Sequence, residues 1–241
     1  MKRTLIRTSS RKAAKHAKGD VQRRTSQVRN RAGGPIPSPL YAILDAGLAK
    51  GGPLTTILRD FLKGGAKLLQ LRAKELTSAE FFNVAKEASR LAHEAGAIFI
   101  VNDRLDIALA CNADGVHLGQ EDLPLSVARK ILGKEKLIGV STHDLSQAQE
   151  AERDGADYIG FGPIFGTATK DTGYSPRGLE MLREIRKAVK IPVVAIGGIT
   201  EKNVAEVWKA GADSAAIISD LMGADDAAEK VRRILALPGR L

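Results

Sequence analysis

The sequence predicts an α/β fold: a single (β/α)8 barrel (TIM barrel) over residues 36–241, behind a disordered basic extension at residues 1–35. After residue 40, apolar or β-branched runs alternate eight times with stretches of helical spacing. Gly or Asn recurs where a helical stretch gives way to the next run. The length of 241 residues suits one barrel domain. An open dinucleotide-binding sheet would instead show a Gly-x-Gly-x-x-Gly turn after its first strand.

Residues 1–35 carry a charge of +10 and so account for the whole net charge of +9. They contain eleven Lys/Arg and one acidic residue, whereas the rest of the chain has 26 basic and 27 acidic residues. Few apolar residues and no sustained period predict disorder, and an idle solvated extension is the favoured interpretation. An organellar transit peptide or an RNA-binding arm stays open, although no aromatic residue is present on which bases could stack.

The eight apolar runs are the predicted barrel strands. They cover residues 40–45, 67–72, 98–102, 115–118, 137–142, 158–164, 192–197 and 214–219. In the second helical stretch Phe81, Ala85 and Leu91 fall on one stripe, and residues 226–237 repeat that spacing at the end of the chain. Residues that accept the left-handed conformation after a helix are expected at Gly64-Gly65, Gly96, Asn112, Gly155 and Gly211.

Composition excludes several classes of protein. Cys111 is the only cysteine, so neither an intrachain disulfide nor a thiolate zinc cluster can form. No apolar run has the length of a membrane span, and the chain start lacks the apolar centre of a secretory signal. We therefore expect a cytoplasmic protein without a membrane partner, while organellar targeting by residues 1–35 stays open.

Two predicted strands are followed at once by a carboxylate. Asp103 comes directly after the third strand, and Asp122 follows the fourth. A right-handed strand–helix–strand unit places successive strand C-termini side by side, and two adjacent carboxylates repel unless a cation lies between them. Oxygen ligands of this kind suit Mg²⁺. Either aspartate could instead cap the helix that follows it.

Polar side chains also end the second and fifth strands. Gln70, Arg72 and Lys74 alternate with Leu71 and therefore share the face toward the barrel axis. Buried unpaired charges are costly, so these cations favour an anionic ligand; pairing of one of them with an acid of a neighbouring strand is the alternative. We expect Ser141 to contact ligand and Thr142 to cap the next helix. His143 is expected on the surface, and His117 as a satisfied core histidine.

The remaining candidates follow the last three strands. The long polar loop after the sixth strand, residues 165–176, carries Thr167, Thr169 and Lys170, and it suits either a lid that closes over substrate or a merely solvated loop. Gly197-Gly198 ends the seventh strand, and Ile218-Ser219 ends the eighth. Backbone N–H groups of the loops after these two strands commonly hold a phosphate.

Taken together, the segments QLRAK, VND, GVHLGQED, GVSTH, GPIFGTATK and AIGGI closely resemble the thiamine-phosphate synthase family over about residues 40–237. The resemblance implies a catalytic barrel that joins a pyrimidine diphosphate to a thiazole phosphate, with Mg²⁺ as cofactor and release of pyrophosphate. It assigns the pyrimidine diphosphate to Gln70, Arg72, Lys74, Asn102, Ser141 and Lys170. It assigns Mg²⁺ to Asp103 and Asp122, and the thiazole phosphate to Thr167, Thr169, Gly198, Ile218 and Ser219. In it Arg72, Lys74 and Lys170 stabilise the departing diphosphate.

Three other functions stay open. A related thiazole tautomerase uses a histidine after the fifth strand, near the position of His143. A nucleic-acid-binding barrel would act through residues 1–35, but nucleic acid is the less favoured partner. A phosphate-sugar isomerase would need general acid and base carboxylates at strand ends. Small-molecule substrates are the expected partners, and assembly into a homo-oligomer is left open.

Overall fold

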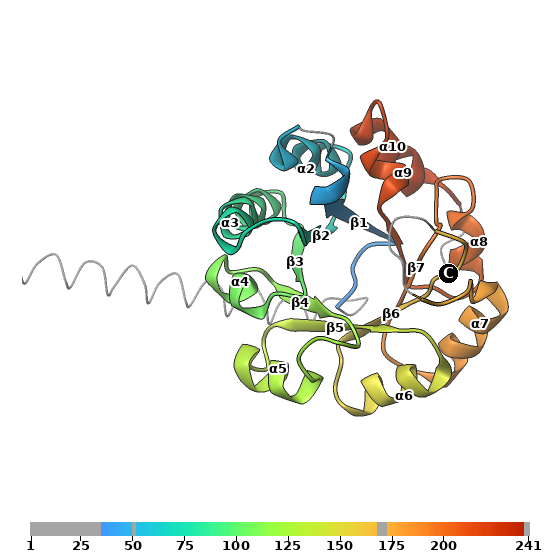
Figure 1. The fold of residues 1–241 in the computed structure, drawn as a ribbon. Coiled ribbons are helices and arrows are strands. Elements are labelled where there is room, and N and C mark those ends of the chain that lie inside the picture. The colour runs from blue at the N-terminus through green and yellow to red at the C-terminus, as the bar shows by residue number, and fades with distance from the viewer. Residues whose placement is uncertain (1–34, 50–51, 168–172, 239–241) are drawn as a thin grey trace, which may run out of the picture.

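The computed structural model describes residues 35–49, 52–167 and 173–238. Eight parallel strands close into a barrel in sequence order, and helices surround it (Figure 1), which confirms the predicted fold class. The strands are β1 Leu40–Asp45, β2 Leu68–Arg72, β3 Ile98–Asn102, β4 Gly115–Leu118, β5 Leu137–Thr142, β6 Tyr158–Phe161, β7 Val193–Ile196 and β8 Ser214–Ile217. The extension predicted at residues 1–35 lies outside the described residues except for Pro35.

The helices follow the strands around the ring. They are η1 Ala46–Leu48, α2 Leu54–Lys63, α3 Ser78–Glu94, α4 Leu105–Ala110, α5 Leu125–Leu132, α6 Leu145–Arg153, α7 Gly178–Ala188, α8 Val204–Lys209, α9 Ser219–Met222 and α10 Ala227–Ala236. In the described part of the chain, none of them is both long and apolar enough to cross a membrane. The last helix, α10, packs beside α2, so the two ends of the barrel domain meet and the ring closes (Figure 1).

Four strands are shorter than predicted: β2 by one residue, β7 and β8 by two, and β6 by three. β6 ends at Phe161 because Pro163, two residues on, has no N–H to donate to the sheet. The chain nevertheless stays close to β7, since the Ile164 N–H donates to the Ile196 carbonyl at 2.8 Å. β8 ends at Ile217, and Ser219 begins the short helix α9 instead of ending the strand.

The helical stripes and the junctions agree with the sequence pattern. Phe81, Ala85 and Leu91 are buried on α3, and Asp226 caps α10 by accepting from the Glu229 N–H. At each expected junction one residue takes the left-handed conformation, with φ between 57° and 103°: Gly65, Gly96, Asn112, Gly155 and Gly211. Gly64 does not; its φ is −71°. Each one stops a helix and turns the chain toward the next strand.

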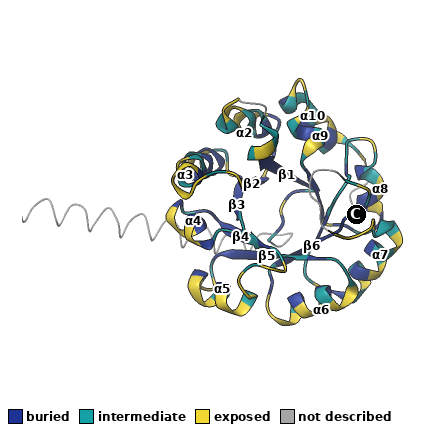
Figure 2. Cartoon of the chain, in the orientation of Figure 1, coloured by how far each residue is buried: buried dark blue, intermediate teal, exposed yellow. Residues whose placement is uncertain are grey.

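The strand side chains contribute to two separate apolar cores. Leu44, Leu71 and Val101 point outward and pack against the helices, whereas Tyr41 and Ile100 belong to a separate cluster inside the barrel. Alternation along each strand produces this division. Figure 2 shows the result as buried strands inside a ring of helices with exposed outer faces. Leu71 therefore lies where the sequence predicts, and Gln70 points inward.

Three aspartates staple neighbouring strands together at the amino-terminal end of the barrel. Each stands just before an even-numbered strand, and one of its oxygens accepts a backbone N–H from the start of the preceding strand. The bonds run from Phe99 to Asp114 at 2.8 Å, from Ile138 to Asp157 at 2.7 Å and from Val193 to Asp213 at 2.8 Å. The same carboxylates contact His93, Arg129 and Arg186, respectively.

These aspartates should stabilise the fold without affecting catalysis. Replacing Asp157 with Ala removes the acceptor of a part-buried N–H and the partner of Arg129, so we expect a loss of about 2 kcal/mol. Urea unfolding followed by circular dichroism measures it. Asp154→Ala, at the exposed end of α6, is the matched control and should leave the midpoint unchanged. An unaltered midpoint for Asp157→Ala would contradict the stapling role.

Candidate active site

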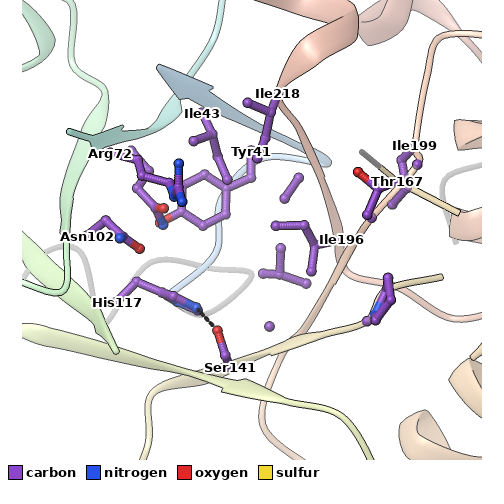
Figure 3. A pocket seen from close by; sticks show the side chains of 18 of the residues that line it. Tyr41, Ile43, Arg72, Asn102, His117, Ser141, Thr167, Ile196, Ile199 and Ile218 are labelled. Atoms are coloured by element: carbon purple, nitrogen blue, oxygen red, sulfur yellow. Dashed lines mark hydrogen bonds between the residues drawn. The ribbon is translucent and has the colours of Figure 1, made fainter. Parts of the chain in front are cut away.

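A pocket opens at the carboxyl-terminal end of the barrel and encloses about 960 Å³, including its open mouth. Every strand, or the turn directly after it, contributes to its wall. Figure 3 shows Arg72, Asn102 and His117 along one side, with Ile196 and Thr167 opposite. The lining comprises Tyr41, Ile43, Gln70, Arg72, Asn102, His117, Ser141, His143, Gly160, Gly162, Pro163, Thr167, Val194, Ile196, Gly197, Gly198, Ile199, Ala216, Ile218 and Ser219.

Arg72, the last residue of β2, and Lys74, two residues beyond it, both have carboxylate partners within the protein. The Arg72 guanidinium lies 2.5 Å from the Asp45 carboxylate, and only 16% of the Arg72 side chain and 3% of the Asp45 side chain are exposed. The half-exposed Lys74 ammonium lies 3.7 Å from the Asp103 carboxylate. The sequence allowed such a pairing for one cation, yet it occurs for two. Because Arg72 and Lys74 both have carboxylate partners, the argument that unpaired cations require an anionic ligand does not hold.

Asp103 has an unusual backbone conformation. Its φ is +61°, and the Arg104 N–H donates across it to the Asn102 carbonyl at 2.7 Å, which makes Asp103 the centre of a γ-turn of the rare positive-φ form. Its own N–H donates to the His117 carbonyl on β4. Such conformations cost free energy and gather at functional sites.

Neither candidate metal ligand is a helix cap. Helix α4 begins after Arg104 without a side-chain cap, and α5 begins after Pro124. Asp122 instead turns back and accepts the Gly119 N–H at 2.6 Å, just beyond β4. Asp103 is also tied to β4, through the His117 carbonyl. The capping alternative is therefore wrong for both aspartates, and both belong to the same barrel rim.

A chain of hydrogen bonds crosses the interior of the barrel and forms part of the pocket wall. We call it the interior hydrogen-bond chain; it links Gln70, Tyr41, Tyr158, His117 and Ser141 in that order. The four donor–acceptor distances are 2.8, 3.0, 3.2 and 3.0 Å. Burial raises the pKa of both phenols well above the ordinary value for tyrosine. The phenols therefore keep their protons.

Two expectations for the end of β5 are wrong. Thr142 does not cap α6; that cap is Asp144, and the buried Thr142 hydroxyl donates to the Gly160 carbonyl. His143 is not a simple surface histidine, because it lines the pocket and stacks on the Tyr174 ring at a centroid distance of 4.0 Å. Its Nδ1 lies 2.6 Å from the Gly162 carbonyl, which can only accept, so Nδ1 carries a proton.

Glycine is required where β7 meets the loop after β6. Gly197 and Gly198 have φ values of 99° and 63°. A Cβ at Gly197 would lie 2.5 Å from that of Pro163, and one at Gly198 would lie 2.5 Å from the Gly166 carbonyl oxygen. Close packing against this loop therefore explains both glycines in the absence of any ligand, and it leaves their backbone at the pocket wall.

Comparison with known proteins identifies the family. The family model for thiamine monophosphate synthase matches residues 40–221, which is most of the barrel. The chain belongs to the thiamine-phosphate synthase family. It is 52% identical over 195 residues to the thiamine-phosphate synthase of Moorella thermoacetica, covering 81% of this chain and 93% of that one. It is 48% identical over 198 residues to that of Chloroflexus aurantiacus, covering 82% and 91%.

A solved structure shows the same likeness. The thiamine phosphate pyrophosphorylase of Pyrococcus furiosus is 41% identical, with a TM-score of 0.75, over 81% of this chain and 93% of that one. The protein is thus an enzyme, a transferase of the thiamine-phosphate synthase family. The matched region is the barrel, and residues 1–34 lie outside the family match.

The pocket unites most of the residues proposed for a synthase site. Nine of them line it: Gln70, Arg72, Asn102, Ser141, Thr167, Gly197, Gly198, Ile218 and Ser219. Lys74, Asp103 and Asp122 belong to the rim and are not part of the lining. Thr169 and Lys170 lie outside the described residues, so the predicted lid over residues 165–176 is described only in part.

The rim aspartates suit the Mg²⁺ that the thiamine-phosphate synthase family implies. In the described ranges, no group of three or more His, Cys, Asp or Glu gathers into a metal cage. Two carboxylates on adjacent strand ends are a different donor set, which matches a cation that keeps several waters and takes substrate phosphate as a further ligand. The absence of a capping role for either aspartate supports this fit.

Several site residues of this synthase-family barrel escaped the sequence analysis. Asp45, Tyr41 and Tyr158 lie within runs treated as strands, and His117 was expected to serve only the core. One signal was available for Asp45, because it ends the first run in the same way that Asp103 follows the third. The pairing of β1 with β2 then sets Asp45 beside Arg72.

Proposed function

We propose that this transferase joins 4-amino-2-methyl-5-(diphosphooxymethyl)pyrimidine to 4-methyl-5-(2-phosphooxyethyl)thiazole, giving thiamine phosphate and pyrophosphate. One observation carries the proposal. A single pocket has polar side chains from β2 to β5 on one side and glycine backbone after β7, with Ser219 after β8, on the other. Two different phosphorylated substrates could therefore meet there, with a largely apolar surface between them.

The β2–β5 side suits the diphosphate substrate. Arg72 is held by Asp45 and cannot swing away, which fixes the direction of its remaining N–H donors. Asn102 and Gln70 add amides that both donate and accept, as the ring nitrogens and exocyclic amine of an aminopyrimidine require. The apolar side chains of Ile43 and Ile196 complete this part of the lining.

The β7–β8 side suits the thiazole phosphate. Gly197 and Gly198 bring backbone to the pocket wall, and Ser219 adds a hydroxyl. Thr167, from the loop after β6, lies beside Ile199 on this side of the pocket (Figure 3) and adds a second hydroxyl. Backbone N–H groups and hydroxyls are suitable partners for a phosphate monoester.

The proposed reaction is dissociative. The C–O bond of the pyrimidine diphosphate breaks, pyrophosphate leaves with the bonding electrons, and the thiazole nitrogen donates its lone pair to the resulting carbocation. Arg72, Lys74 and Lys170 would stabilise the charge that develops on pyrophosphate more than they stabilise the ground state. Mg²⁺ held by Asp103 and Asp122 would supply further charge neutralisation. The apolar lining around Ile196 would keep water from the carbocation.

Incubation of the pure full chain with both phosphorylated precursors tests this function. We expect equal amounts of thiamine phosphate and pyrophosphate with Mg²⁺ and almost none after chelation. Each precursor alone is the control for hydrolysis. Stoichiometric release of pyrophosphate from the pyrimidine alone, without thiamine phosphate, would reject the synthase assignment.

Because His143 lines the pocket, a thiazole tautomerase is the second candidate. A tautomerase would interconvert isomers of the thiazole phosphate without any pyrimidine. Nuclear magnetic resonance of the thiazole phosphate incubated alone with the enzyme distinguishes the two activities. We expect no isomerisation, since the polar β2–β5 side of the pocket would have no role in a tautomerase.

The basic extension should be dispensable for catalysis. Removing residues 1–35 leaves Ile36, which is buried within the barrel interior cluster, so the barrel retains its packing. We expect kcat and KM of the truncated enzyme to equal those of the full chain. A nucleic-acid-binding barrel would instead lose a salt-sensitive affinity for RNA on truncation. Loss of synthase activity would show that the extension belongs to the catalytic unit.

A further inference from the structure

The interior hydrogen-bond chain has a direction. The Gln70 amide nitrogen can only donate, so the Tyr41 hydroxyl accepts from it. Among the described residues, the acceptor in reach of the Tyr41 proton is the Tyr158 oxygen, 3.0 Å away. Tyr158 thus accepts from Tyr41, and its own single proton is directed onward to His117.

The same assignment of donors and acceptors extends through His117 to Ser141 at the pocket. Because Tyr158 donates to Nδ1 of His117, that nitrogen must be bare, and the proton of the neutral imidazole is on Nε2. Nε2 then donates to the Ser141 oxygen at 3.0 Å. The hydroxyl proton of Ser141, which lines the pocket, is left to point toward a ligand acceptor.

We propose that Tyr158 is a positioning residue that fixes the Nε2-protonated tautomer of His117 and thereby makes Ser141 a hydrogen-bond donor toward the diphosphate of the substrate. The identity of the ligand rests on the proposed function; the direction of the chain does not. If every hydrogen bond of the interior hydrogen-bond chain ran the other way, the Ser141 hydroxyl would donate to His117. Only its oxygen lone pairs would then point toward the substrate, and they would repel an anion.

Tyr158 itself is out of reach of any ligand. It is fully buried and does not belong to the pocket lining, unlike Tyr41 and His117. Its place is made by Gly139, which pairs with it across β5 and β6: a Cβ there would lie 2.1 Å from the Tyr158 ring. The ring and its hydroxyl are therefore held in one orientation, and the residue can act on substrate only through its neighbours.

The tautomer can be measured in the full chain without substrate. With ¹⁵N-labelled histidine, we expect His117 to show a protonated Nε2 and a bare Nδ1. The chain has four histidines, so His117→Asn assigns the signals. In Tyr158→Phe, both tautomers should be populated. A proton on Nδ1 of His117 in the wild type, alone or together with one on Nε2, overturns the proposal. An unchanged tautomer in Tyr158→Phe overturns it as well.

A second variant covers the case in which Tyr158→Phe fails to fold. Tyr41→Phe keeps the Tyr158 hydroxyl but removes the donor that directs it, so His117 should again show both tautomers. The matched control is Ser214→Ala. It removes a buried hydroxyl of β8 that has no hydrogen-bond partner among the described residues, and it should leave the His117 spectrum unchanged.

Kinetics test the link to Ser141. In Tyr158→Phe we expect KM for the pyrimidine diphosphate to rise about tenfold, as for loss of one charge-assisted hydrogen bond, with kcat changing less. Ser141→Ala should have a similar effect, and the double variant no further one. Equal rises in KM for both substrates, or additive effects, would overturn the positioning role. If the wild type makes no product, the proposed function fails, while the tautomer result still decides the direction of the chain.

Discussion

Replacing Asp103 or Asp122 with Asn is expected to slow metal-dependent pyrophosphate release by at least about a hundredfold. Each change removes one of two rim carboxylates, and charge neutralisation by a bound cation supplies several kcal/mol of transition-state stabilisation. Asn is preferred to Ala at position 103 because it tolerates the positive φ of 61° better than other residues with a side chain. Steady-state release of pyrophosphate across a range of Mg²⁺ concentrations measures the effect.

A matched control lies close to this site. Asp106 is exposed in the first turn of α4 and pairs with Arg104, so Asp106→Asn should leave turnover unchanged. If the variants lose affinity for the metal, raised Mg²⁺ should restore part of the rate. Full turnover by either the Asp103→Asn or the Asp122→Asn enzyme at ordinary Mg²⁺ would remove these aspartates from the mechanism.

The second large effect is expected for Arg72→Met. The substitution keeps an unbranched apolar stem but leaves the Asp45 carboxylate buried without its guanidinium partner, which costs about 3 kcal/mol. It also removes a cation from the proposed diphosphate site, so kcat/KM should fall by about two orders of magnitude or more. Urea unfolding and steady-state kinetics measure the two losses separately.

A double variant separates stability from catalysis. Arg72→Met combined with Asp45→Asn removes both charges, so most of the lost stability should return while kcat/KM stays low. Arg104→Met is the control, because it breaks the partly exposed pair with Asp106 and should cost less than about 1 kcal/mol. Recovery of activity in the double variant would show that Arg72 serves the fold and not the substrate.

The fold was predictable because its signals are local. The apolar runs carry the strand positions, and left-handed residues such as Gly155 and Asn112 mark where each helix stops. The errors at the ends of β6 and β8 have local causes as well. Pro163 ends the ladder after β6, and Ser219 prefers the start of a helix to the end of a strand.

The site was predictable only where a polar residue follows an apolar run. Arg72, Asn102 and Ser141 satisfy that condition and line the pocket. Partners across the barrel are set by the stagger between strands, which no single segment encodes. The bond between Tyr41 and Tyr158 joins residues 117 positions apart, and the Arg72–Asp45 pair depends on the register of two strands. Such contacts need the closed barrel.

The three aspartates that staple β3, β5 and β7 to the strands that follow them lie at the end of the barrel opposite the pocket. Closure of the barrel is therefore secured at one end while chemistry occupies the other. A substitution at the catalytic end, such as one at Thr167, leaves these three hydrogen bonds in place. A barrel built in this way can acquire new substrates and keep its architecture, because substitutions at the catalytic end do not remove the aspartate hydrogen bonds at the opposite end.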